Sequence, residues 1–167
     1  MRRLWLVASA ALLACAACGA GSSGPKLEPG QAVVRRVVDG DTIVVRVGGR
    51  DERVRLIGVD TPETVDPRKP VQCFGKEASA HTKSLLPAGT VVRLERDVEP
   101  RDRYDRLLAY VFRVADGLFV NLELARDGYA QQLTIPPNVA YVDQIRAAVA
   151  AARREGKGLW ASCAASA

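Results

Sequence analysis

From residue 32 onward, the apolar stretches of this chain are short, rich in valine and interrupted by glycine. Runs of this length and β-branched composition are typical of strands, because a branched side chain suits the pleated surface of a sheet. The first three predicted strands are 32–38, 41–47 and 52–59, with turns at Asp39-Gly40 and at Gly48-Gly49-Arg50. The folded part of the chain therefore begins as a β-meander.

Two further β-type runs and three helical segments follow. The first helix is expected to end before Pro87, and Asn121 is a candidate N-cap for a short helix that ends at Gly128. Five short strands, with one helix between the third and the fourth, predict an α+β, mainly β fold: a five-stranded OB-fold barrel with three helices. These later segments are a helix at 75–86, strands at 90–96 and 107–114, and helices at 121–128 and 141–155.

The N-terminus has the pattern of an export signal. Arg2 and Arg3 precede an apolar run that is too short to span a bilayer. Leu12-Leu13-Ala14-Cys15 resembles a lipobox, so Cys15 (or Cys18) is the predicted lipidated residue; an ordinary secretory peptide is the alternative. We expect an exported bacterial lipoprotein that faces outward from the cell membrane. The predicted parts are a lipoprotein signal peptide 1–14, a flexible tether 15–31, one domain 32–163 and a short tail 164–167.

Charge and cysteine content limit the possible partners and sites. The formal charge is +5, but loss of Arg2 and Arg3 with the signal leaves 22 basic and 19 acidic residues, so the charge only hints at an anionic partner. Beyond the signal region, Cys73 and Cys163 remain, and in an oxidising compartment such a pair predicts one disulfide. Two cysteines and a single histidine, His81, make a structural zinc site a poor interpretation. For His81, a surface or packing role is expected.

Carboxylates and arginine gather in two segments, 39–42 and 55–63. In the predicted hairpin, residues whose numbers sum to about 99 face each other, which places Asp41 opposite Gly58 and close to Asp60. Like charges held this close call for a cation, and hard oxygen ligands suit calcium or magnesium. Each residue alone also fits a turn, a loop cap or a solvated strand position. Together they supply a base, a metal pocket and guanidinium groups for attack on a phosphodiester.

The order and spacing of these residues resemble the staphylococcal nuclease, or thermonuclease, family. The matching segments read DGDT at 39–42, VRLIGVDTPET at 54–64 and YDRLLAY at 104–110, and the similarity covers about 32–163. This resemblance implies a calcium-dependent nuclease on an OB-fold barrel. It would hydrolyse DNA and RNA, single-stranded or locally opened, by metal-assisted attack of water, and leave 3′-phosphate products. A monomer is expected.

The resemblance also implies a metal site and a base. Asp41 and Asp60 match residues that bind calcium through their carboxylates, and Thr61 matches one that contributes its backbone carbonyl. Glu63 matches the carboxylate that activates or orients the attacking water.

The same resemblance assigns the phosphate contacts. Arg55 and Arg106 match arginines that bind the phosphate and stabilise its transition-state charge, a task suited to planar guanidinium forks. Arg103 and Tyr104 are expected to contact a neighbouring phosphate, with a merely solvated loop as the alternative.

Two departures from the family pattern affect substrate binding. The segment 133–138 contains no aromatic residue, whereas the family reference stacks bases on tyrosines there, so weaker base stacking is expected. Asp105 stands where the reference has glycine, next to Arg106.

Two other functions compete with the enzyme. One is an OB-fold binding module whose hydrolytic centre has been lost, and the other is a structural envelope lipoprotein. The presence together of Arg55, Asp60, Glu63 and Arg106 favours the enzyme over both.

Overall fold

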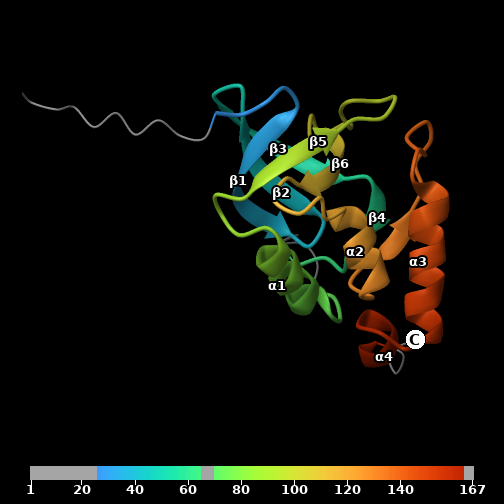
Figure 1. Cartoon of the computed structure of the whole chain (residues 1–167). Coiled ribbons are helices and arrows are strands. Elements are labelled where there is room, and N and C mark those ends of the chain that lie inside the picture. The colour runs from blue at the N-terminus through green and yellow to red at the C-terminus, as the bar shows by residue number, and fades with distance from the viewer. Residues whose placement is uncertain (1–25, 65–69, 164–167) are drawn as a thin grey trace, which may run out of the picture.

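The structure is a computed structural model that describes residues 26–64 and 70–163 (Figure 1). The predicted signal peptide, the lipidated cysteine, the tether up to residue 25 and the tail 164–167 lie outside the described residues. Within those two ranges, no helix is both long enough and apolar enough to cross a bilayer.

The described chain forms seven strands and four helices, with the first four strands ahead of the first helix. The strands are β1 Gln31–Asp39, β2 Thr42–Val47, β3 Arg50–Leu56, β4 Gly58–Asp60, β5 Val91–Glu95, β6 Leu107–Arg113 and β7 Gln131–Leu133. The helices are α1 Gly75–Leu85, α2 Val120–Arg126, α3 Val142–Arg154 and α4 Leu159–Ser162.

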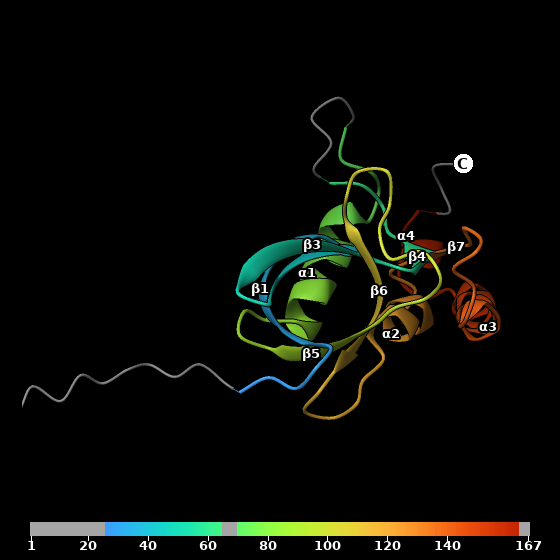
Figure 2. The same ribbon diagram turned by 90° about the horizontal axis from the view of Figure 1, so that it is seen from above.

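Five strands close a barrel in the order β1-β2-β3-β6-β5, which confirms the predicted five-stranded OB-type barrel. The pairs are antiparallel except for β3 and β6, which run parallel with Arg55 beside Leu108. Seen from above, α1 lies within the ring of strands, and in the first view it lies below them, so α1 covers one end of the barrel (Figures 1 and 2). Helices α2 and α3 lie on one flank.

The core fills the barrel with the valine-rich faces of its strands. Alternate residues of β2 and β3 point inward, because side chains alternate across a strand. A buried aromatic residue, Tyr110, packs edge-on against Tyr141 of the segment before α3, with ring centroids 4.6 Å apart. The largest fully buried aliphatic side chains include Ile43, Val45, Val54, Leu56, Val92, Val111, Leu124 and Ile145.

The hairpin register differs from the prediction. Gly48 and Gly49 alone form the turn, with φ of 55° and 80°, so Arg50 already belongs to β3. Two left-handed residues are what a tight two-residue hairpin requires. Thr42 therefore faces Arg55, and the prediction that Asp41 faces Gly58 is wrong: the Asp41 carbonyl accepts a hydrogen bond from the Leu56 N–H (2.9 Å).

The predicted third strand also divides in two. Gly58 has φ 84°, which ends β3 and turns the chain into β4. β4 pairs outside the barrel with β7, a three-residue strand that the sequence did not predict. The bend brings the loop after Asp60 against the residue before β2, where the Thr61 N–H donates a hydrogen bond to the Asp41 carboxylate (2.9 Å). The four-residue helix α4 was not predicted either.

Asn121 does not cap α2, contrary to the prediction, because it lies inside the helix. Its buried side chain accepts a hydrogen bond from the Val111 N–H (2.9 Å) and donates one to the Ile57 carbonyl (2.8 Å). One amide thus joins α2 to β6 and to the β3–β4 bend, where a buried carbonyl would otherwise lack a partner.

Candidate active site

One cavity contains all six residues predicted for catalysis and metal binding. Its volume is about 390 Å³, and it opens where β1, β2 and β4 meet the side of β3 and the loop before β6. The parallel pairing of β3 with β6 brings the two arginines together, although 51 positions separate them in the sequence. The residues in question are Asp41, Arg55, Asp60, Thr61, Glu63 and Arg106.

Asp41 is buried and its carboxylate accepts several hydrogen bonds. Oδ2 accepts from the Thr61 backbone N–H (2.9 Å) and from the Thr61 hydroxyl (3.2 Å), and Oδ1 accepts from the Thr42 hydroxyl (3.0 Å). Helix α1 supports the preceding turn, since the Thr82 hydroxyl donates to the Gly40 carbonyl (2.6 Å). These contacts hold the strand β2 and the loop after β4 together around one carboxylate.

Arg55 lies between the two aspartates. It donates to the carbonyls of Leu56 (2.6 Å) and Val59 (2.7 Å) and pairs with Asp60 (2.8 Å) and Asp41 (3.2 Å). Its side chain is only 12% exposed. The guanidinium is therefore fixed before any ligand enters, which favours recognition of an anion at a defined position.

Burial raises the pKa of Asp60, in opposition to the Arg55 charge and together with the negative charges of Asp41 and Glu63. Burial likewise raises the pKa of Asp39, despite a hydrogen bond from the Thr64 hydroxyl (2.6 Å). Burial and neighbouring negative charges disfavour the ionised form of these carboxylates. A nearby cation would stabilise that form.

The oxygens available here fit a hard divalent cation. Asp41 and Asp60 offer carboxylates, and Thr61, whose backbone carbonyl is the third expected ligand, lines the same cavity. Across residues 26–64 and 70–163, no group of three or more His, Cys, Asp or Glu is arranged to bind a metal. Two carboxylates and one carbonyl are fewer than the roughly six to eight oxygens that Ca²⁺ takes, so water or substrate oxygens would have to complete the set.

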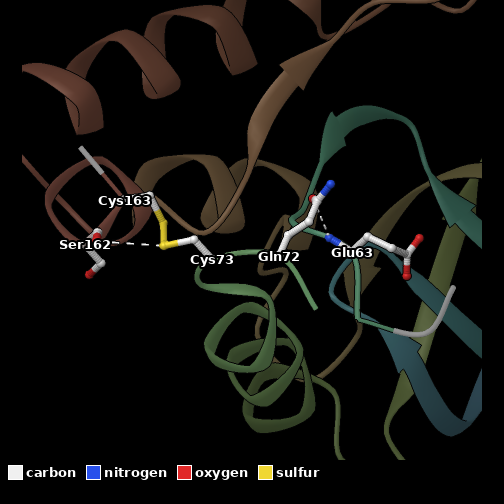
Figure 3. Close-up of a disulfide and its surroundings, with 5 residues drawn as sticks. All are labelled: Glu63, Gln72, Cys73, Ser162 and Cys163. Carbon is white, nitrogen blue, oxygen red and sulfur yellow. Dashed lines mark hydrogen bonds between the residues drawn. A yellow bond between two sulfur atoms is a disulfide. The ribbon is translucent and has the colours of Figure 1, made fainter. Parts of the chain in front are cut away.

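Glu63 lines the same cavity, and its backbone is held on both sides by Gln72. The Glu63 N–H donates to Gln72 Oε1 (2.9 Å), and the Gln72 N–H donates to the Glu63 carbonyl (3.0 Å). The Glu63 carboxylate accepts from the Thr64 N–H (2.9 Å). Figure 3 shows Gln72 against the Glu63 backbone while the Glu63 carboxylate points away from it.

Cys73, which follows Gln72, forms a disulfide with Cys163 (Figure 3). The bond crosses 90 positions of sequence and joins the segment before α1 to the end of α4. The Cys73 sulfur also lies 3.8 Å from the Ser162 carbonyl oxygen.

Asp102 orients Arg106, a role that the sequence reasoning missed. It accepts from Arg106 Nε (2.7 Å) and from the Arg106 backbone N–H (3.0 Å), and it also accepts from the Tyr104 N–H (3.0 Å). Although burial opposes the shift, these hydrogen bonds lower the pKa of Asp102. The four-residue spacing from Asp102 to Arg106 is the signal that could have indicated the pair.

A second cavity, of about 510 Å³, adjoins the first and shares Arg55 and Arg106 with it. Arg103 and Tyr104 line it from the loop before β6; Tyr104 is 65% exposed and accepts a hydrogen bond from Arg103 (2.7 Å). Leu133 and Ile135 line the opposite side, so its wall is aliphatic where the family resemblance leads one to expect tyrosine.

Asp105 has a physical explanation. Its φ is 62°, a left-handed conformation in which glycine is natural and aspartate is among the better tolerated alternatives. Its carboxylate pairs with Arg101 (3.5 Å), whereas Arg106 is paired with Asp102. The extra negative charge is therefore balanced away from Arg106.

His81 and Trp160 lie outside both cavities. The His81 ring stacks on Tyr129 at 3.9 Å and its Nε2 lies 3.0 Å from Asp127, which agrees with a packing role. Trp160 is half-buried under Arg153, and in this C-terminal segment Leu159 is the fully buried anchor.

Comparison with known proteins agrees with the fold and the arrangement of the site. Residues 53–162 match the family model described as "Staphylococcal nuclease homologue". The chain is 50% identical to a thermonuclease of Staphylococcus intermedius over 77% of its own length and 74% of that protein's. It is 46% identical to a thermonuclease of Staphylococcus hyicus, over 77% and 75% of the two chains. It is 40% identical to the endonuclease YncB of Bacillus subtilis, over 75% and 59%.

Proposed function

Because the chain belongs to the staphylococcal nuclease homologue family, we propose that it is a calcium-dependent nuclease that hydrolyses DNA and RNA and leaves 3′-phosphate products. The observation that carries this proposal is the single cavity that contains Asp41, Arg55, Asp60, Glu63 and Arg106. A binding module would have no need for a base, two fixed guanidinium groups and paired carboxylates on one wall. The relatives that match most of the chain bear the names thermonuclease and endonuclease.

The proposed reaction places the target phosphate between Arg55 and Arg106. Their guanidinium groups, held by Asp41 and Asp60 on one side and by Asp102 on the other, bind its non-bridging oxygens. Glu63 takes a proton from a water molecule, whose oxygen attacks phosphorus opposite the 5′-oxygen. The bond from phosphorus to the 5′-oxygen breaks, solvent returns a proton to that oxygen, and the phosphate stays on the 3′ side.

The carboxylates of Asp41 and Asp60 and the carbonyl of Thr61 would hold Ca²⁺. When bound, the ion supplies positive charge beside the phosphate and so stabilises the charge that develops there. The Asp41 carboxylate is already fixed by Thr42 and Thr61, so this part of the ligand set is preorganised.

For cellular placement, we propose an outward-facing membrane lipoprotein anchored through Cys15 (or Cys18), with secretion of the free protein as the alternative. The support is the N-terminal sequence pattern. A monomer is proposed.

The test is cleavage of single-stranded DNA by the purified protein, with added calcium or with a chelator, next to a Glu63→Ala variant. We expect cleavage only with calcium, termini that carry a 3′-phosphate, and a loss of about 10²-fold or more in the variant. Tight binding of DNA without cleavage by the unmutated protein would overturn the proposal in favour of a binding module.

A further inference from the structure

The outer face of β1, β2 and β3 carries a row of exposed arginines outside the six residues of the candidate active site. Arg35 and Arg36 project from β1, and Arg53 projects from β3. None of the three forms an ion pair with any residue in the two described ranges. On the same face, Arg46 is neutralised by Asp51 (2.6 Å).

Strand register places these charges in line with the site. Arg36 faces Val44 and Val44 faces Arg53. The side chains of these paired residues therefore lie on one side of the sheet. The next pair on the same side of the sheet is Thr42 and Arg55. Each lies two residues along its strand from the Val44–Arg53 pair, a distance of about 7 Å. Val44 is only 7% exposed, consistent with aliphatic arginine stems on both sides of it.

Two further observations tie the arginines to one another and to the cavity. Arg53 itself lines the cavity that holds Arg55 and Glu63. The pKa of Asp51 is lowered by its hydrogen bond from Arg46 and by the charges of Arg46, Arg35 and Arg36, which places all of them in one electrostatic field. The arginines therefore extend from the edge of the candidate active site across the outer face of the barrel to β1.

We propose that Arg35, Arg36 and Arg53 form a track that binds the sugar–phosphate backbone of a polynucleotide beyond the phosphate held by Arg55. This inference rests on the proposed function and assigns part of its substrate specificity: long chains gain affinity from the track, and the shortest ones do not. Charge would then supply the affinity that an aliphatic wall at Leu133 and Ile135 cannot provide by base stacking.

The test compares Arg36→Gln/Arg53→Gln with Arg146→Gln/Arg154→Gln, which removes the same charge from exposed positions on α3. Binding of a fluorescent 30-mer is measured with chelator present, at several salt concentrations. We expect about tenfold weaker binding and a salt slope reduced by about 1.4 in the first variant, since each phosphate contact on a single strand contributes about 0.7. The α3 variant should match the unmutated protein.

Cleavage of a dinucleotide should be equal in Arg36→Gln, a change outside the candidate active-site cavity, and in the unmutated protein. An unchanged salt slope would overturn the track. So would a loss of binding to phosphatidylserine vesicles without any loss of DNA binding, which would identify the arginines as a lipid-headgroup surface. Because the binding arm needs no cleavage, failure of the proposed nuclease activity would be distinguished from failure of the track.

A second, independent inference concerns Gln72. Besides the two hydrogen bonds that it makes to the Glu63 backbone, Gln72 is covalently followed by Cys73 of the disulfide (Figure 3). Close packing surrounds the same segment: a Cβ on Gly75 would lie 3.1 Å from the Glu63 carbonyl oxygen. Phe74 lies between Cys73 and Gly75 in the sequence, and its backbone is left-handed at φ 66°, a strained conformation for an aromatic residue. The centroid of its ring is 5.1 Å from that of Tyr129.

We infer that Gln72 is a positioning residue for Glu63 and that the Cys73–Cys163 bond fixes Gln72 in turn. A base must lie within hydrogen-bond reach of the attacking water, so a small displacement of its backbone lowers the rate of the chemical step. Gln72 lines the same cavity, but the phosphate-binding arginines come from other elements, β3 and the loop before β6, so substrate affinity should be preserved.

The test is Gln72→Leu, with Val71→Ala as the neighbouring control. We expect kcat to fall about tenfold at unchanged KM, and the Glu63 and Thr64 amides to exchange hydrogen faster, whereas Val71→Ala leaves both unchanged. The exchange measurement does not depend on catalysis, so it tests the inference even if no cleavage is found. An unchanged exchange rate, or a higher KM at normal kcat, would contradict it.

The disulfide arm uses Cys73→Ala/Cys163→Ala and the unmutated protein treated with dithiothreitol. Each dithiothreitol passes two electrons and two protons to the disulfide, which opens to two thiols, while the reagent closes to its own disulfide. We expect the same fall in kcat in both samples, with no further effect of the reagent on the double variant. Full kcat in the double variant would refute the role of the bond.

Discussion

At the scale of single residues, Arg106 illustrates why charge alone does not define the site. Asp102 fixes one edge of its guanidinium through Nε and Nη2, which leaves the rest of the planar group for an anion. Arg106→Lys retains the charge but loses the fork, and we expect kcat to fall about 10²-fold or more. The measurement is single-turnover cleavage of DNA, with Arg154→Lys, a change on the exposed face of α3, as control. Normal turnover in Arg106→Lys would remove Arg106 from the mechanism.

Tyr110 gives a residue-scale prediction on pH. Burial raises the pKa of its phenol from 10 to about 12, opposed by backbone hydrogen bonds and aided by Asp97. The folded state thus holds the proton more tightly than the unfolded state, so this contribution to stability is complete below about pH 10 and is lost as the pH rises toward 12. As the pH rises, we expect the free energy of unfolding to fall less in Tyr110→Phe than in the unmutated protein. The difference between the two losses should reach up to about 2 kcal/mol at pH 11.5.

The measurement for Tyr110 is urea unfolding at a series of pH values, with Tyr104→Phe as the exposed control. Parallel curves for Tyr110→Phe and the unmutated protein would contradict the prediction.

Among the residues of the site, those predicted from the sequence are charged groups that would act directly on the phosphate, the water or a metal ion. Asp41, Arg55 and Glu63 line one cavity, where the family resemblance led us to expect them, and their roles stay predictions. Asp102 and Gln72 were missed, because each acts on a neighbour through a contact that depends on the folded loop. For Asp102, the four-residue spacing to Arg106 was the signal available, whereas nothing in the sequence indicated the role of Gln72.

At the scale of elements, the bend between β3 and β4 sets the position of Asp60. Gly58 has φ 84°, and a Cβ there would lie 2.5 Å from Ile145 Cδ1 of α3. Gly58→Ala therefore combines a strained backbone with a clash, and we expect it to lower the free energy of unfolding by about 2–4 kcal/mol.

The matched control for Gly58→Ala is Gly89→Ala, where φ is 91° and a Cβ would have no atom within 4 Å. It should cost only the backbone component, about 1 kcal/mol. Chemical denaturation of both variants measures the difference, and equal losses would show that the close approach of α3 is unimportant.

Strands and helices that a long sequence pattern specifies were predicted. Strands that exist only through pairing with another strand were missed. Valine-rich runs gave the five barrel strands, because burial on one face demands such residues. β4 and β7 have three residues each and exist through their mutual register, which no local pattern encodes. The hairpin register was off by two positions, because the turn needed only Gly48 and Gly49.

At the scale of the whole molecule, the Cys73–Cys163 bond restricts the unfolded chain over 90 positions. In the chain-entropy description, a loop of this size is worth about 4–5 kcal/mol of stability. We expect Cys73→Ala/Cys163→Ala to unfold at a clearly lower denaturant concentration. The control is the reduced unmutated protein, which should approach the variant, and coincident curves for oxidised and reduced protein would contradict the expectation.

The parallel contact between β3 and β6 also determines when, during synthesis of the chain, the candidate active site becomes complete. Arg55 and Arg106 become neighbours only through this non-local pairing, and such pairings form late, since a long loop must close before any contact rewards it. A chain still emerging from the ribosome can present Asp41 and Glu63 but not both arginines. A nascent polypeptide whose strand β6 has not yet paired with β3 therefore holds an incomplete candidate active site.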